Sequence, residues 1–189
     1  KKSGRNPRGR IISAAWQLFY QQGYDNTTVE DIVFESETSK GFFYHYEDPI
    51  PGRLVVFDHG MGNGHRAYMR EIERLAKAGF LVFSYDHTGC MKSGGNTTGG
   101  FLHSLIDLND CINSLKADDK YNGLDISVMG HSWGAFSTLN ICALHPEVSH
   151  IVAMSGFVGL EAIFKQFLSV FYKKIYLEEA AKEPEFVKF

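Results

Sequence analysis

The sequence has 189 residues, enough for one domain or for one small and one medium domain. Apolar residues make up 44% and charged residues 22%, a composition typical of a globular protein that can bury a core. The net charge of −3 excludes a wholly basic nucleic-acid-binding protein, and no stretch is long and apolar enough to span a membrane. Because no apolar signal-peptide core is present near residue 1, the sequence predicts a cytoplasmic protein.

The cysteines and the N-terminal residues bear on metal binding, disulfide formation and contacts to nucleic acid. Cys90, Cys111 and Cys142 are odd in number and lack metal-ligand spacing, so reduced thiols are predicted, with no metal and no cofactor. Residues 1–10 carry five basic side chains and no acidic one. Such an arm is compatible with contacts to DNA phosphates and equally with a solvated tail.

Three short helices are predicted in the first quarter of the chain. Asn6 and Pro7 are suited to start the first helix, and Gly23 is suited to end it. A capping box at residues 27–30 starts the second helix, and residues 38–40 cap a third that runs to residue 46. Three short helices with small or polar turns are typical of a helix-turn-helix module, predicted here over residues 1–46.

Short motifs occur in a fixed order along this segment: Arg10-Ile11-Ile12, Ala15, Leu18-Phe19, Gly23-Tyr24, Thr27-Thr28-Val29, Asp31-Ile32, Ser39-Lys40-Gly41 and Tyr44-His45-Tyr46. With these motifs, residues 8–46 resemble the DNA-binding domain of the TetR-type repressors. The resemblance implies that the third helix enters a major groove of duplex DNA. It would place Thr38, Lys40 and Phe42 near bases or sugars, and Thr28, Tyr44 and His45 at phosphates. The alternative is a small helical cap whose aromatic residues belong to the core.

A different pattern begins after a predicted linker at residues 47–53, which contains two prolines and a glycine. Apolar strands are predicted at residues 54–58, 80–85, 126–129 and 150–154, and helices at 68–77, 102–116 and 135–144. This alternation predicts an α/β domain over residues 54–189 with a mostly parallel, doubly wound sheet. Right-handed crossovers then bring the loops that contain His59, Asp86 and Ser132 to one edge of the sheet.

One stretch carries the chemistry of this domain. Gly130-His131-Ser132-Trp133-Gly134 follows an apolar strand and precedes a helix, which is the context of a nucleophile elbow. A turn this tight requires nearly side-chain-free positions at Gly130 and Gly134. It would hold Ser132 in a strained backbone conformation, with its Oγ exposed and the first amides of the helix facing a developing oxyanion.

Further motifs accompany this stretch: His59-Gly60-Met61-Gly62, Tyr68, residues 75–80, residues 85–89, Ser93-Gly94-Gly95 and His145-Pro146. Together they make residues 52–160 similar to the α/β hydrolases, in particular to the group of monoacylglycerol lipases and serine-aminopeptidase-like esterases. The resemblance implies Ser132 as the nucleophile, an oxyanion hole from the backbone amides of Met61 and Trp133, and a small acyl ester or amide substrate. Met91 stands where this group usually has a second glycine, which affects a loop.

The remaining members of a catalytic triad are not found in the sequence. A serine needs a histidine base and an orienting carboxylate, and in α/β hydrolases both follow the serine on loops after later strands. After residue 154 the sequence instead predicts cap-like helices at about residues 160–182. The domain therefore resembles a truncated hydrolase with impaired activity. Asp86 is expected to tether its own loop, and His59, His65, His87 and His131 are expected to form structural hydrogen bonds.

Three functional hypotheses follow from the sequence. The chain is a serine acyl hydrolase acting through Ser132, or a TetR-like DNA-binding regulator with an inert α/β body, or a composite without activity. An open sheet that lacks its last strands exposes an edge, so self-association is predicted as well.

Overall fold

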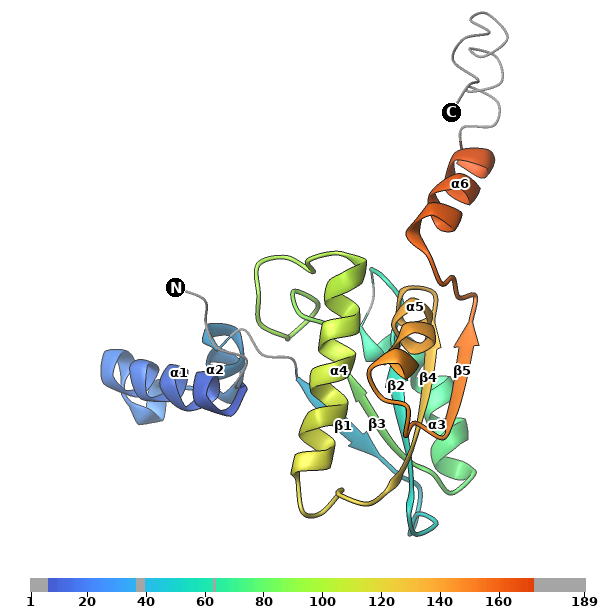
Figure 1. Ribbon diagram of the computed structural model, residues 1–189. Coiled ribbons are helices and arrows are strands. Elements are labelled where there is room, and N and C mark those ends of the chain that lie inside the picture. Colours follow the sequence, from blue (N-terminus) through green and yellow to red (C-terminus); the bar gives the residue numbers. More distant parts are fainter. Residues whose placement is uncertain (1–6, 37–39, 63, 172–189) are drawn as a thin grey trace, which may run out of the picture. The chain divides into compact units, whose positions relative to one another are not determined.

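The computed structural model describes residues 7–36, 40–62 and 64–171 (Figure 1). The chain up to Gly156 forms one compact unit, and a second unit begins at Phe157. No helix within the described ranges is long and apolar enough to cross a membrane.

The first unit is built around one five-stranded sheet. Its strands are β1 (Gly41–Tyr44), β2 (Arg53–Asp58), β3 (Leu81–Tyr85), β4 (Asp125–His131) and β5 (His150–Met154). They lie in the order β1-β3-β2-β4-β5. The strands from β2 to β5 are parallel to their neighbours, and only β1 is antiparallel. The predicted α/β fold with a mostly parallel sheet is confirmed.

Helices cover both faces of this sheet, as Figure 1 shows. They are α3 (Met69–Lys77), which follows the 3-10 turn η2 (His65–Tyr68), and α4 (Phe101–Ala117) and α5 (Trp133–Asn140), which the 3-10 turn η3 (Ile141–Ala143) extends. Alternate residues of β2 serve the two faces: Leu54 and Val56 pack with α4, and Phe57 packs with α3. A strand buried on both faces must be apolar throughout, which explains the continuous apolar run of β2.

The N-terminal segment contains α1 (Pro7–Gln22), the 3-10 turn η1 (Tyr24–Asn26) and α2 (Val29–Glu35). Gly23 has the positive φ of 87° expected at the end of α1. The capping box of α2 lies one residue later than predicted. Thr28 is the N-cap and Asp31 closes the box, whereas Thr27 donates its hydroxyl hydrogen to the Gly23 carbonyl.

The predicted third helix over residues 41–46 is wrong, because residues 41–44 form strand β1 of the main sheet. Long-range contacts decide this. The ring of Phe43 stacks on Tyr121 with centroids 4.3 Å apart and also packs against Phe83. A Cβ on Gly41 would lie 2.2 Å from the Phe83 ring, so any larger residue here would displace that ring. The sheet of the α/β body thus begins inside the segment that resembles a TetR module.

The second unit contains α6 (Leu160–Phe171), which covers part of the predicted cap-like helices. The apolar side chains of Phe164, Phe167 and Leu168 on α6 are each more than half exposed. Residues 172–182 of the same prediction lie outside the described residues. In the first unit, no described strand pairs with the outer edge of β5. Self-association through exposed apolar surface stays a prediction.

Candidate active site

The carboxyl ends of three parallel strands bring the predicted site residues together. The β2 strand ends at Asp58 and leads into His59 and Gly60, and β3 leads into Asp86. The β4 strand lies on the other side of β2, parallel to it, and leads into Ser132. Because β2, β3 and β4 run in the same direction, these loops lie at one edge of the sheet, as predicted.

Ser132 lies in the turn between β4 and α5. Its backbone has φ 53° and ψ −108°, a conformation that non-glycine residues rarely adopt. Its amide donates to the carbonyl of Met154 at 2.9 Å, and its carbonyl accepts from the amide of Phe136 at 3.1 Å. The backbone of Ser132 is therefore fixed between the neighbouring strand β5 and the first turn of α5.

The two glycines of this turn have no room for a side chain. A Cβ on Gly130 would lie 2.4 Å from the carbonyl oxygen of Gly134 and 2.4 Å from the Thr138 hydroxyl. A Cβ on Gly134 would lie 2.3 Å from the carbonyl oxygen of Asp58. Helix α5 therefore packs directly on its own turn and on the end of β2.

The two amides predicted for the oxyanion hole come from different elements. Trp133 is the first residue of α5, where backbone N–H groups lack partners within the helix. Met61 follows Gly60 in the turn after β2, and its side chain is 53% exposed. The buried indole of Trp133 packs against the rings of His87 and His59, with centroids 4.4 Å and 6.3 Å away.

His59 fixes the segment that precedes Met61 from the interior. Its Nε2 accepts from the backbone N–H of His87 at 3.0 Å, so the ring proton is on Nδ1, which donates to the Gly60 carbonyl at 2.8 Å. Burial lowers the pKa of His59, which favours the neutral ring that this arrangement requires. In this structure His59 has the hydrogen-bonding role expected for it.

A buried ionic cluster lies beneath Trp133. His87 is fully buried between two carboxylates: its Nε2 is 2.6 Å from Asp58 Oδ1, and its Nδ1 is 3.4 Å from Asp107 Oδ2. Burial lowers the pKa of His87, but the charge of Asp58 and the interaction of the ring with the Asp107 carboxylate outweigh this and raise it to about 10. Asp107 also accepts from the backbone N–H and the hydroxyl of Thr88, at 2.8 Å each.

Asp86 tethers a neighbouring segment. Its Oδ1 accepts from the backbone N–H of His65 at 2.9 Å and from the His65 ring at 2.8 Å. Its backbone carbonyl accepts from the Ser93 hydroxyl at 2.6 Å. Burial raises the pKa of Asp86, but the bonds from His65 outweigh this and lower it below its ordinary value. Asp86 is therefore an ionised anchor for η2 as well as for its own loop.

All eight histidines of the sequence lie within the described residues. His59, His65 and His87, at the edge of the sheet that carries Ser132, contact the partners described above. His131 contacts the Tyr68 hydroxyl. His145 lies against Glu147 and Asn109 at 3.0 Å and 3.1 Å, and His150 lies 3.0 Å from the Ser149 hydroxyl. Within the described ranges, no histidine forms a hydrogen bond with the side chain of Ser132.

Met91 has the positive φ of 49° and is 66% exposed. The position that resembles a glycine of the hydrolase motif thus retains a backbone conformation that favours glycine. The substitution is confined to an exposed loop. Of the described residues, no group of three His, Cys, Asp or Glu side chains is arranged to hold a metal ion.

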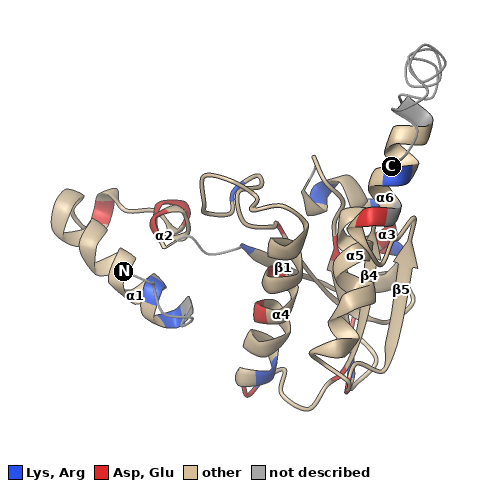
Figure 2. Cartoon of the chain, turned by 45° about the horizontal axis from the view of Figure 1, so that its top comes forward, with Lys and Arg blue, Asp and Glu red and all other residues tan. Residues whose placement is uncertain are grey.

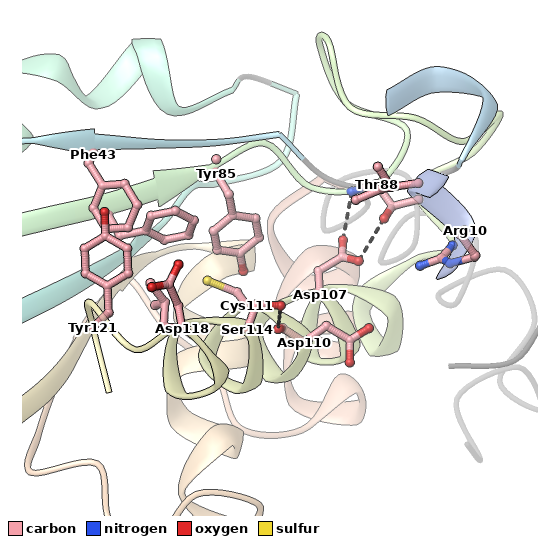
Figure 3. A pocket seen from close by; sticks show the side chains of 14 residues that line it. Arg10, Phe43, Tyr85, Thr88, Asp107, Asp110, Cys111, Ser114, Asp118 and Tyr121 are labelled. Atoms are coloured by element: carbon pink, nitrogen blue, oxygen red, sulfur yellow. Dashed lines mark hydrogen bonds between the residues drawn. The ribbon is translucent and has the colours of Figure 1, made fainter. Parts of the chain in front are cut away.

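A cavity of about 290 Å³ lies between the sheet and α4, on the side of β1 (Figure 3). Its lining includes Phe43 of β1, Tyr85 of β3, and Asp107 and Cys111 of α4. It reaches the buried ionic cluster through Asp107 but does not include Ser132. This cavity is thus separate from the predicted nucleophile.

The residues predicted to contact DNA are in different surroundings from those of a recognition helix. Lys40 immediately precedes β1 and forms an ion pair with Glu30. Phe42 of β1 stacks on His65 with centroids 4.3 Å apart, and Tyr44 packs near the Phe57 core. His45 contacts the Glu47 carbonyl at 2.8 Å.

The remaining two residues predicted to contact DNA are Thr28 and Thr38. The Thr28 hydroxyl is hydrogen-bonded to Asp31 in the capping box, and Thr38 lies outside the described residues. Figure 2 shows basic residues on α1 and acidic residues on α2. They are Arg8 and Arg10 on α1, and Glu30, Asp31 and Glu35 on α2.

Two family models match adjoining parts of the chain. Residues 49–186 match the model described as "Serine aminopeptidase, S33". Residues 11–46 match the model described as "Bacterial regulatory proteins, tetR family". Both resemblances predicted from the sequence are confirmed by these matches.

Individual relatives divide the chain in the same way. A monoglyceride lipase homolog of Monkeypox virus is 29% identical over 123 residues, which are 62% of this chain and 44% of the relative. An uncharacterized HTH-type transcriptional regulator of Lactococcus lactis is 46% identical over 44 residues, which are 23% of this chain and 22% of the regulator.

Among solved structures, an esterase of Pyrococcus furiosus superposes with a TM-score of 0.58 and 26% sequence identity. The match covers 78% of this chain and 62% of the esterase. The chain therefore spans less than half the length of the two curated relatives and about three fifths of the esterase.

Proposed function

Because the chain belongs to the serine aminopeptidase S33 family of α/β hydrolases, we propose that it is a serine acyl hydrolase. It acts on a small ester or amide through an acyl-enzyme on Ser132. The observation that carries this proposal is the backbone of Ser132, held at φ 53° between β4 and α5. This conformation, with glycines that leave no room for a Cβ on both sides, supports a nucleophile elbow at Ser132.

The chemical steps follow from this arrangement. Ser132 Oγ attacks the acyl carbonyl carbon and loses its proton to a base, and the carbonyl oxygen becomes an oxyanion. The amides of Met61 and Trp133 stabilise this oxyanion by hydrogen bonds. Collapse of the intermediate breaks the bond to the leaving alcohol or amine, and water then hydrolyses the acyl-enzyme.

The reaction needs a general base for Ser132, and the described residues do not place a histidine there. His65, His131 and His145 are bonded to other partners, and none of the described histidines is hydrogen-bonded to Ser132. Without a general base, triad hydrolases keep only a residual acceleration of roughly 10³–10⁴ over water. We therefore expect slow turnover by this chain alone, with the oxyanion amides providing most of the catalysis.

Covalent labelling tests the nucleophile directly. Incubation with a fluorophosphonate is expected to add one phosphonyl group per chain, because the oxyanion amides of a formed elbow also bind the phosphonyl oxygen. The adduct is read by intact mass and located on Ser132 by peptide mapping. The labelling rate constant is expected to be low compared with that of a complete triad.

Ser132→Ala serves as the matched negative variant, and Ser127→Ala, on the strand β4 that leads into Ser132, as a serine control. The control is expected to label like the native chain, and Ser132→Ala is expected not to label. A folded native chain that stays unlabelled at high probe concentration would count against the hydrolase.

The second candidate function is binding of duplex DNA by the TetR-like segment, which the family match over residues 11–46 supports. The conformation of residues 40–44 limits how this segment could contact DNA. Phe42 stacks on His65 and Tyr44 packs, partly buried, against the Phe57 cluster, so neither side chain lies on a recognition helix that could enter a major groove. We propose that any binding in this conformation is electrostatic and independent of sequence.

Retention on duplex DNA is accordingly expected at about 50 mM salt and lost at about 200 mM salt. Lys40→Ala is expected to leave retention unchanged, because Lys40 pairs with Glu30. Fluorescence anisotropy with two unrelated duplexes measures both effects. Strong preference for one duplex, weakened by Lys40→Ala, would instead indicate a recognition helix in place of β1.

A further inference from the structure

Tyr68 ends the 3-10 turn η2 and immediately precedes α3, at the edge of the sheet that carries Ser132. Its ring packs against Phe57 of β2 with centroids 5.2 Å apart, and against His131 with centroids 5.5 Å apart. The ring is thus held between the ends of β2 and β4, the two strands that lead into the predicted site.

The hydroxyl of Tyr68 joins those two strand ends. It accepts from the backbone N–H of Gly60 at 3.0 Å and lies 2.8 Å from Nδ1 of His131. Since its oxygen accepts from Gly60, its own hydrogen is available to His131. Burial raises the pKa of Tyr68, so the phenol stays protonated and can donate.

The space around Gly60 supports the same conclusion. A Cβ on Gly60 would lie 2.6 Å from the Tyr68 hydroxyl and 3.2 Å from Nδ1 of His131. Gly60, the phenol and the imidazole therefore lie in mutual contact. Gly60 adjoins Met61, and His131 adjoins Ser132.

The position of Tyr68 is itself fixed at the other end of η2. The His65 amide and ring are bonded to the buried carboxylate of Asp86, and Phe42 of β1 stacks on the His65 ring. A residue whose own backbone is anchored loses little further conformational entropy when its side chain holds a neighbouring segment.

We infer that Tyr68 is a positioning residue that locks the Gly60–Met61 segment onto the strand end that carries Ser132. The inference rests on the proposed function, because the segment it locks supplies one of the two oxyanion amides. His59 holds the Gly60 carbonyl from the interior, and Tyr68 holds the Gly60 amide from the opposite side. One peptide unit on each side of Gly60 is thus fixed.

Tyr68→Phe isolates the hydroxyl, because the ring and its contact with Phe57 remain. Hydrogen exchange by NMR is expected to be about tenfold faster at the Gly60 amide, while core amides such as Ile72 keep their protection. The maximal rate of fluorophosphonate labelling is expected to fall about tenfold, with the half-saturating probe concentration unchanged. This division is expected when an oxyanion donor is misplaced but the site remains folded.

Tyr121→Phe is the matched control, because it also removes one phenol hydroxyl. The Tyr121 ring stacks on Phe43 of β1 and not on the segment that contains Gly60. Unchanged exchange at Gly60 in Tyr68→Phe would overturn the inference, and so would faster exchange with an unchanged labelling rate. If the native chain is not labelled at all, the proposed hydrolase fails, and the exchange of Gly60 alone decides whether Tyr68 holds the loop.

Discussion

Gly134→Ala is expected to destabilise the protein by about 3 kcal/mol and to abolish labelling of Ser132. The added Cβ would lie 2.3 Å from the carbonyl oxygen of Asp58, 2.6 Å from its carbonyl carbon and 2.8 Å from the carbonyl oxygen of His59. All three atoms belong to the backbone, so no side-chain rotation relieves the contact. Alanine favours a helix by about 1 kcal/mol over glycine, which offsets only part of this cost.

Urea unfolding followed by circular dichroism measures the loss of stability. Gly159→Ala is the control, because nothing lies within 4 Å of its added Cβ and its φ is not positive. Its effect is expected to stay within about 1 kcal/mol. A Gly134→Ala protein with native stability and native labelling would contradict the close packing of α5 on β2.

The sequence was sufficient to predict the α/β body because its strands and helices carry strong local patterns. The strand at residues 150–154 is found as predicted, and α4 differs from its prediction by one residue at each end. The edge that gathers His59, Asp86 and Ser132 follows from parallel strands alone. Local composition and chain direction together determine these features.

Strand β1 could not be predicted in this way. Residues 41–46 carry the motif of a helical family, and nothing in Gly41-Phe42-Phe43-Tyr44 excludes a helix. The strand forms because Phe43 meets Phe83 and Tyr121, which lie far along the chain. Tertiary contacts of this kind override local preference, and a single sequence does not display them.

The site was predicted in part for the same reason. The G-x-S-x-G spacing predicts Ser132 as the nucleophile, because the turn constrains adjacent residues. The bridge from Tyr68 to His131 joins residues 63 positions apart. Likewise, the cluster of Asp58, His87 and Asp107 joins three elements. The sequence indicates only that polar residues follow the apolar strands. Their position suggests a structural role but does not identify their partners.

His87→Gln is expected to destabilise the protein by about 3 kcal/mol near neutral pH, because it leaves the buried carboxylate of Asp58 without its counter-charge. His87 and Asp58 are both fully buried, with 2.6 Å between Nε2 and Oδ1. His150→Gln is the matched control, since His150 is exposed and its ring lies 3.0 Å from the hydroxyl of the adjacent Ser149. The control is expected to stay within about 0.5 kcal/mol of the native chain.

The same residue predicts a dependence of stability on pH. The two carboxylates raise the pKa of His87 in the folded state to about 10, above the value of about 6.5 expected when unfolded. Between these values the folded state binds one more proton than the unfolded state. The contribution of His87 is therefore complete below about pH 6.5 and is lost as the pH rises towards 10, by up to about 1.4 kcal/mol per pH unit.

Unfolding measured in urea at several pH values from 6 to 10 gives this slope, and the His87→Gln protein is expected to have a flatter one. Trp133 offers a local reporter, because its ring lies 4.4 Å from that of His87. In a Trp16→Phe background its fluorescence is expected to change with the deprotonation of His87, near pH 10. Equal slopes in the native and His87→Gln proteins would mean that His87 is not charged in the fold. The Gly60–Met61 segment would then be held by the hydrogen bonds of His59 and Tyr68 alone, without a charged cluster beneath it.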